Sequence, residues 1–227
     1  MEILLVIGFL VLFGLLAYLS YLQKKKRQEA FRALATRLGC RYYVDDPFSL
    51  SARYEGHFPT LQQGSRRYAY NVIDGLLDGR RMHVFDHHHE TYSRDSKGRK
   101  STHHHHRTFL CLEHDADLGR IEVRPENFLD RVGGFFGFDD IDFESEEFSR
   151  KYHVKAEERK LAYDVFHPKM IEFFLRLGNF KVTTSRNLAL FRRGSNTMSV
   201  EEIERTMLEA DGFLDLLPRY LRKDRPA

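Results

Sequence analysis

The sequence predicts an α+β protein, with an N-terminal transmembrane helix followed by a mixed domain that contains an antiparallel β-meander and C-terminal helices. Three observations predict this class. The chain starts with an uncharged apolar stretch, its middle alternates short β-rich stretches with turn residues, and its last third carries helix start signals. The composition, 42% hydrophobic and 30% charged residues in a chain of 227, is that of a folded protein.

The apolar stretch ILLVIGFLVLFGLLAYLSYL covers residues 3–22 without a charge. A helix of this length rises about 1.5 Å per residue and spans the roughly 30 Å hydrocarbon core of a bilayer. No basic residue precedes the stretch and no small-x-small cleavage site follows it, which argues against a cleaved signal peptide. We therefore predict a transmembrane anchor at residues 1–23.

The charges beside this stretch predict its orientation. The positively charged residues Lys24, Lys25, Lys26 and Arg27 follow it, whereas only Met1 and Glu2 precede it. Basic flanks stay in the cytoplasm, so we expect a single-pass protein of the cell (inner) membrane with a cytosolic domain over 40–227. The four basic side chains are expected to contact anionic membrane lipid, at about 1 kcal/mol each.

Net charge and cysteine spacing limit which other partners, and which redox compartment, the sequence predicts. Residues 1–27 carry four basic groups and one acid, a net charge of +3, and the whole chain is also +3, so residues 28–227 sum to zero. A domain without a basic excess is not expected to bind nucleic acid. Cys40 and Cys111 have no CxxC spacing, which favours a reducing compartment. A protein partner is the remaining expectation.

A juxtamembrane amphipathic helix is predicted at 24–39. Phe31, Leu34, Ala35 and Leu38 share one helical face, and Gly39 is a natural stop. No Gly/Ser-rich or Pro-rich spacer separates this helix from the anchor. We therefore expect the anchor to continue into the domain without a flexible linker.

The β-meander is predicted from five β-rich stretches, at 40–44, 67–75, 80–92, 104–114 and 120–125. Near residue 125 the sequence changes from mainly β-rich stretches to a mixture with helices, and Pro125 is placed to start a helix. A subdivision of the 40–227 domain near this residue is therefore an open alternative. Further on we expect a strand at 150–156, two helices divided at Pro168, and a hairpin at 180–193 that turns at Ser185–Asn187. Ser199 and Glu202 predict a capping box for a last helix that continues toward Arg222.

The acidic segment FDDIDFESEEF at 138–148 lacks the glycine and ligand order of a calcium loop. We interpret it as the capped start of a helical turn rather than a magnesium or calcium site. Phe143 and Phe148 are predicted to be buried there.

The region 85–114 holds eight of the twelve histidines and reads as a hairpin with its tip near Lys97 and Gly98. If strand partners sum to about 195, His89 faces His106. The predicted metal ligands, brought within reach on one face, are His87, His89, His104 and His106. A divalent metal such as zinc would then be the cofactor.

Two alternatives stay open for this hairpin. A slip of one residue places His88 opposite His106 and Glu90 opposite His104, which gives a mixed His/Glu set. The other alternative is a solvated hairpin tip with no dedicated site, because the apolar part of the strands lies further from the tip.

The sequence identifies no catalytic group. GxSxG is absent, no Ser/His/Asp spacing singles out a triad, and Cys111 lies on an apolar strand face where a thiol is inert. The prediction is a membrane-tethered cytosolic domain that acts as a non-enzymatic binding or scaffold module. The alternative is a metal-binding sensor or metalloenzyme that uses the His-rich hairpin, and whether the chain is an enzyme stays open.

The block IDFESEEFSRKYHVKAEERKLAYDVFHPKMIEFFL at 141–175 resembles uncharacterised bacterial families of single-pass membrane proteins, domains of unknown function with DIxFExxEFxxxFxV and AYxxxxPxMxE segments. The corresponding positions here are Ile141, Asp142, Phe143, Glu144, Glu147, Phe148, Val154, Ala162, Tyr163, Pro168, Met170 and Glu172. FDHHHET is similar to the FDYxYxT strand of those families. The resemblance implies a membrane anchor and no particular reaction, and it implies that the histidines are peculiar to this sequence.

Overall fold

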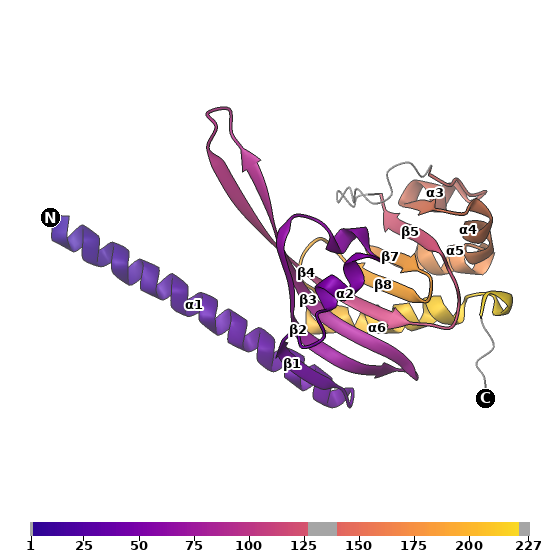
Figure 1. Cartoon of the computed structure of the whole chain (residues 1–227), viewed down its shortest axis with the longest axis horizontal. Helices are drawn as coiled ribbons and strands as arrows, with labels where there is room; N and C mark the ends of the chain where they lie inside the picture. Colours follow the sequence, from indigo (N-terminus) through magenta and orange to yellow (C-terminus); the bar gives the residue numbers. More distant parts are fainter. Residues whose placement is uncertain (1, 127–139, 223–227) are drawn as a thin grey trace.

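The computed structural model describes residues 2–126 and 140–222. Its first element is helix α1, Glu2–Arg37, which runs for 36 residues without interruption (Figure 1). The apolar part of α1 is exposed from residue 6 to residue 22, whereas Phe31, Leu34 and Ala35 are buried against the domain. By length and composition α1 could cross a membrane, and the expected absence of a flexible linker is confirmed.

The domain is built on one antiparallel sheet in the strand order β1-β2-β3-β4-β8-β7-β5-β6. The strands are β1 Arg41–Asp45, β2 Ser65–Leu77, β3 Arg80–Arg94, β4 Lys100–Glu113, β5 Arg120–Pro125, β6 Tyr152–Ala156, β7 Phe180–Ser185 and β8 Leu188–Arg193. The first four of the five predicted β-rich stretches form a meander, whereas the fifth, at 120–125, is β5 and pairs with β6 and β7 instead of β4. Strand β8 joins β4, so both halves of the chain share the sheet. The predicted α+β class is confirmed.

Helices cover both faces of the sheet. They are α2 Leu50–Glu55, η1 Pro59–Leu61, α3 Glu146–Lys151, α4 Arg159–Val165, α5 Pro168–Arg176, α6 Val200–Asp215 and η3 Arg219–Leu221. The larger hydrophobic core lies between one face and the domain end of α1, α3, α4, α5 and α6. A smaller core lies on the other face beneath α2 and η1. The strands β2, β3, β4 and β8 therefore carry apolar side chains on both faces.

Several local expectations are confirmed. Pro168 separates α4 from α5, and β7 and β8 form the hairpin that turns between Ser185 and Leu188. Ser199 and Glu202 form a reciprocal capping box at the start of α6. The Ser145 side chain accepts a hydrogen bond from the Phe148 N–H at the start of α3, as expected for a capped helical turn.

Two expectations about helices are wrong. Pro125 starts no helix, because it is the last residue of β5 and pairs with Tyr152; residues 127–136 of that predicted helix lie outside the described ranges. The last long helix does not continue toward Arg222 but ends at Asp215. Pro218 follows closely, and a proline disfavours helical backbone in the residue before it.

The aromatic cluster around α3 confirms the prediction for Phe148, which is fully buried. Its ring lies within 5.4–6.2 Å of four neighbouring rings, centroid to centroid, and these belong to Phe143, Tyr152, Phe166 and Phe174. Phe143 packs against the same core but keeps part of its surface in solvent.

The register of β3 and β4 positions the histidines. Partner numbers sum to 194, so His88 faces His106 and Glu90 faces His104. The register that sums to 195 is wrong by one residue, and the slipped alternative is the one observed. Two constraints fix it: the Asp95 side chain closes the tip by accepting the N–H groups of Lys97 and Arg99, and apolar side chains must reach the correct core on each face. Beyond β2 the two strands project as a ribbon from the body of the domain (Figure 1).

Candidate functional site

The histidine ribbon has two chemically different faces. The face toward α1, called here the helix-side face, carries Asp86, His88, Glu90, Tyr92, His104, His106 and Thr108. The opposite face carries His87, His89, His103, His105 and Arg107. The four predicted ligands are therefore divided: His87 and His89 lie on the opposite face, and His104 and His106 on the helix-side face. The reason is the two-residue period of a strand, in which a slip of one residue turns each side chain to the other face.

On the opposite face, His87 is fully buried and its Nε2 lies 3.2 Å from Ser51 Oγ. Its neighbour His89 stacks on His105, with ring centroids 4.7 Å apart. Burial, together with a smaller effect of neighbouring positive groups, lowers the pKa of His87 to about 3. The Ser51–His87 contact, which the sequence did not reveal, resembles a nucleophile and base, but an imidazole with that pKa is a weak general base.

The helix-side face brings three metal-ligand types together. His88 Nε2 lies 3.1 Å from His104 Nδ1, and His104 Nδ1 lies 3.5 Å from Glu90 Oε1. One donor atom from each of these residues lies within 4.8 Å of the other two. His88 and Glu90 are buried, whereas 57% of the His104 side chain is exposed. This is the mixed His/Glu set that the slipped register predicts.

The surrounding contacts orient these three side chains. His88 Nδ1 lies 3.1 Å from the carbonyl oxygen of Arg66, and the Tyr68 ring lies against His88 with 4.7 Å between centroids. The Tyr92 hydroxyl donates to Glu90 at 2.9 Å, and an Arg66 guanidinium nitrogen lies 3.6 Å from the same carboxylate. Burial raises the pKa of Glu90, but the Tyr92 hydrogen bond and the charge of Arg66 bring it below the ordinary value.

Backbone irregularities in β2 make these contacts reachable. The pairing of β2 with β3 shifts between Ser65 and Tyr68, and Arg66 has a φ of 49°. This bulge turns the Arg66 carbonyl toward His88. Gly64 has a φ of 67°, and a Cβ atom there would lie 2.2 Å from the carbonyl oxygen of Glu90. Only glycine fits at this close approach.

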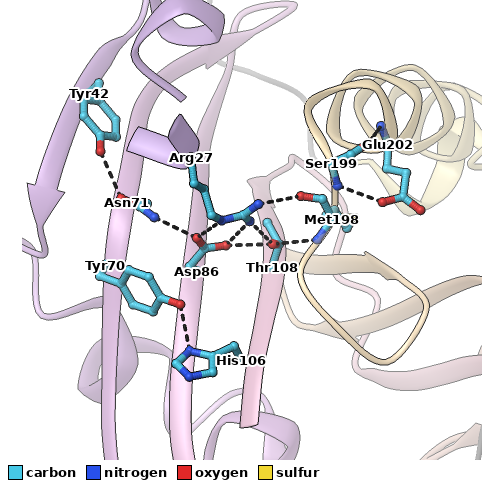
Figure 2. A network of polar contacts seen from close by, with 10 residues as sticks. All are labelled: Arg27, Tyr42, Tyr70, Asn71, Asp86, His106, Thr108, Met198, Ser199 and Glu202. Carbon is cyan, nitrogen blue, oxygen red and sulfur yellow. Dashed lines mark hydrogen bonds and ion pairs between the residues drawn. The ribbon is translucent and has the colours of Figure 1, made fainter. Parts of the chain in front are cut away.

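A buried polar network joins the ribbon to α1 (Figure 2). It is centred on the pair Asp86–Thr108, which follows the pair His88–His106 on the helix-side face toward the body of the domain. Arg27 Nε and Nη2 donate to the two carboxylate oxygens of Asp86 at 2.7 and 2.6 Å. Arg27 also donates to Thr108 Oγ1 at 2.9 Å and to the carbonyl oxygen of Met198 at 3.1 Å. Asp86 in turn accepts from Thr108 at 2.7 Å and from Asn71 at 2.9 Å.

The sequence analysis did not predict this role of Arg27, which it placed among the lipid-contacting residues. The guanidinium is occupied by protein acceptors, so Arg27 does not belong with Lys24, Lys25 and Lys26 in the expected lipid-contacting cluster. A signal was present in the sequence, because Arg27 precedes Phe31 by four residues and therefore shares the face that Phe31 buries.

A cleft of about 520 Å³ lies where α1 meets the edge of the domain, and we call it the junction cleft. Its lining residues are Ser20, Gln23, Lys24, Arg27, Gln28, Val44, Asp45, Tyr68, Tyr70, Asn71, His106 and Thr197. Tyr70 and His106 are joined by a hydrogen bond of 2.8 Å between the hydroxyl and Nδ1. A larger cleft of about 840 Å³ is lined by residues from 45–55 and 64–69. Of these two clefts, the junction cleft is the one lined by residues of α1.

Burial makes the two cysteines unsuitable as reactive groups. Cys111 is buried in β4, and burial raises its pKa to about 12. Burial likewise raises the pKa of Cys40. Both thiols are free, and the expectation that Cys111 lies on an apolar strand face is confirmed.

Fold and junction together define an α+β domain that is attached without a linker to one helix long and apolar enough to cross a membrane. No family model and no curated protein matches the chain, which is consistent with its resemblance to uncharacterised families. Among solved structures it is similar to the crystal structure of the mycobacterial trehalose monomycolate transport factor A, TtfA. The TM-score is 0.60 at 15% identity, over 84% of this chain and 96% of that chain. At that identity the likeness shows a shared fold.

Proposed function

We propose that this chain is a membrane-tethered, non-enzymatic binding module that holds its α+β domain in one orientation on the cytoplasmic side of the cell (inner) membrane. The observation that carries the proposal is the ion pair between Arg27 and Asp86. It ties the helix that leaves the membrane to the middle strands of the sheet.

A protein that needs only to stay near a membrane can use a flexible linker. Here α1 continues into the domain and buries Phe31 and Leu34, and the Asp86 side chain is wholly removed from water. A buried carboxylate is tolerated only when it is paired and hydrogen-bonded. Rotation of the domain about α1 would break those bonds, so the same surface always faces the membrane.

That surface suits two kinds of partner. Lys24, Lys25 and Lys26 are exposed just beyond the apolar part of α1, where anionic lipid headgroups lie. The junction cleft opens beside them and offers hydrogen-bonding groups from Tyr70 and Gln28. A protein in the same membrane could dock there as well, and the fold shared with a transport factor supports a transport-related role by analogy.

The test is to isolate the full-length chain from the membranes of its own host in mild detergent. The control carries a flexible Gly/Ser insertion between Gln23 and Lys24, which keeps the anchor and the Arg27 network but separates them, and with them Ser20 and Gln23 from the rest of the junction cleft. We expect a membrane-protein partner at fixed stoichiometry with the wild type, cross-linking to the junction cleft, and loss of that partner from the control. Equal recovery by both, or recovery by neither, would contradict the proposal.

A further inference from the structure

We propose that His88, Glu90 and His104 form a binding site for one divalent transition-metal ion, of which Zn²⁺ is the representative, on the helix-side face of the ribbon. Two imidazoles and one carboxylate are a ligand set that zinc accepts, with a fourth position left for water. The site is independent of the partner proposed above.

The distances between the ligand atoms fit such an ion. Zinc binds histidine nitrogen at about 2.0 to 2.1 Å, so the ligand atoms of a tetrahedral site lie about 3.3 Å apart. His88 Nε2 and His104 Nδ1 are 3.1 Å apart, and His104 Nδ1 and Glu90 Oε1 are 3.5 Å apart. Two of the three separations are thus within a few tenths of an ångström of the tetrahedral value, and one ligand atom of each residue lies within 4.8 Å of the other two.

The hydrogen bond between His88 and Arg66 selects the required tautomer. A carbonyl oxygen can only accept, so His88 Nδ1 must carry the proton in its 3.1 Å contact with Arg66. In a neutral imidazole the other nitrogen, Nε2, is then unprotonated, and its lone pair points at His104 Nδ1 3.1 Å away, within the cluster. Metal-binding histidines are oriented in this way by backbone carbonyls or carboxylates.

Glu90 has comparable support. Its carboxylate is buried, and it accepts the Tyr92 hydroxyl at 2.9 Å with Arg66 close by. A single positive side chain that is itself 76% exposed leaves room for a second, more compact positive charge. Because His104 is the most exposed of the three, an ion can enter from solvent on its side.

The opposite face of the same ribbon supplies a matched control. His103 is exposed, as His104 is, and it is the next residue along β4. Its Nε2 contacts Ser93 at 2.8 Å on the face away from the cluster. His103→Ala and His104→Ala thus remove the same side chain from neighbouring exposed positions, and neither is expected to unfold the domain.

The experiment is calorimetric titration of Zn²⁺ into metal-free full-length protein in detergent micelles, with Co²⁺ as a spectroscopic substitute. We expect one ion per chain and the visible absorption of four-coordinate Co²⁺. His104→Ala and Glu90→Gln should each weaken binding by more than about tenfold, while His103→Ala leaves the affinity within about twofold of the wild type. Failure of the wild type to bind one equivalent, or equal losses from His103→Ala and His104→Ala, would show the ribbon to be only a solvated histidine surface and overturn the proposal.

Discussion

Arg27 and Asp86 are 59 positions apart in the chain, yet the guanidinium of one binds both carboxylate oxygens of the other at 2.6 and 2.7 Å. Asp86 is completely buried, whereas 26% of the Arg27 side chain remains exposed. The carboxylate therefore depends on its partner more than the guanidinium does. This asymmetry makes the pair testable from both sides.

Arg27→Ala should lower the free energy of unfolding by about 3 to 5 kcal/mol, because it leaves the buried Asp86 charge without its partner. Asp86→Ala should cost less, since Arg27 can turn toward water. Lys26→Ala is the control: that side chain is exposed on the preceding residue, and its loss should change the unfolding free energy by less than about 0.5 kcal/mol. Urea titrations of the full chain in micelles would give the values, and equal costs for Arg27→Ala and Lys26→Ala would rule out the structural role of the pair.

Stability should fall with acid between about pH 6.5 and pH 4. Burial lowers the pKa of His83 and of His114 to about 4. The unfolded chain takes up these protons near pH 6.5, whereas the folded chain does so only near pH 4. Protons therefore favour the unfolded state over this window, at up to about 1.4 kcal/mol per pH unit for each histidine, and the full stability is present above it.

Replacement of one of these histidines tests the acid effect. His114→Gln should reduce the slope of unfolding free energy against pH by close to one proton between pH 4 and pH 6.5, whatever its effect on stability at neutral pH. Denaturant titrations at a series of pH values would measure this. An unchanged slope would mean that His114 titrates alike in the folded and unfolded chain.

Gly64→Ala should destabilise the domain more than Gly79→Ala, by about 1 to 3 kcal/mol. Both glycines have a positive φ, of 67° and 73°, so alanine is strained at either position. A Cβ atom at Gly64 would also meet the Glu90 carbonyl oxygen, whereas Gly79 has open space around it. Thermal unfolding of the two variants isolates the close approach, and equal midpoints would show that β2 can move away from Glu90.

Phe148→Ala should cost about 3 to 5 kcal/mol, the range for an aromatic side chain removed from a packed core. Phe148 is fully buried among four aromatic rings. Phe143→Ala should cost less, because Phe143 lies at the margin of the same cluster with part of its surface in solvent. Chemical denaturation would rank the two, and the reverse order would place the centre of the cluster at Phe143.

The orientation of the chain can be tested with topology reporters fused after Ala227. The basic residues that follow the apolar stretch predict that a reporter active only in the cytoplasm will be active at this position. Moving the three lysines 24–26 to precede Glu2 should weaken or reverse that result. Activity of a periplasmic reporter on the unaltered chain would place the domain on the other side of the membrane.

The sequence by itself determined the elements whose signals are local. The uncharged stretch at 3–22, the capping box of Ser199 and Glu202 and the break at Pro168 each depend on residues a few positions apart, and each is where the sequence placed it. The meander followed from the same kind of signal, because strand period and turn residues can be read within about a dozen positions.

Tertiary structure decided the register of the ribbon and the partner of Arg27. The hairpin tip alone allowed partner sums of 194 or 195, and a one-residue change separates His87 and His89 from His104 and His106. The choice came from packing on both faces at once, since Val84 and Leu110 must reach one core while Phe85 and Phe109 reach the other. Likewise, nothing near Arg27 in the sequence names Asp86, because only the packing of α1 across the sheet brings a buried carboxylate to it.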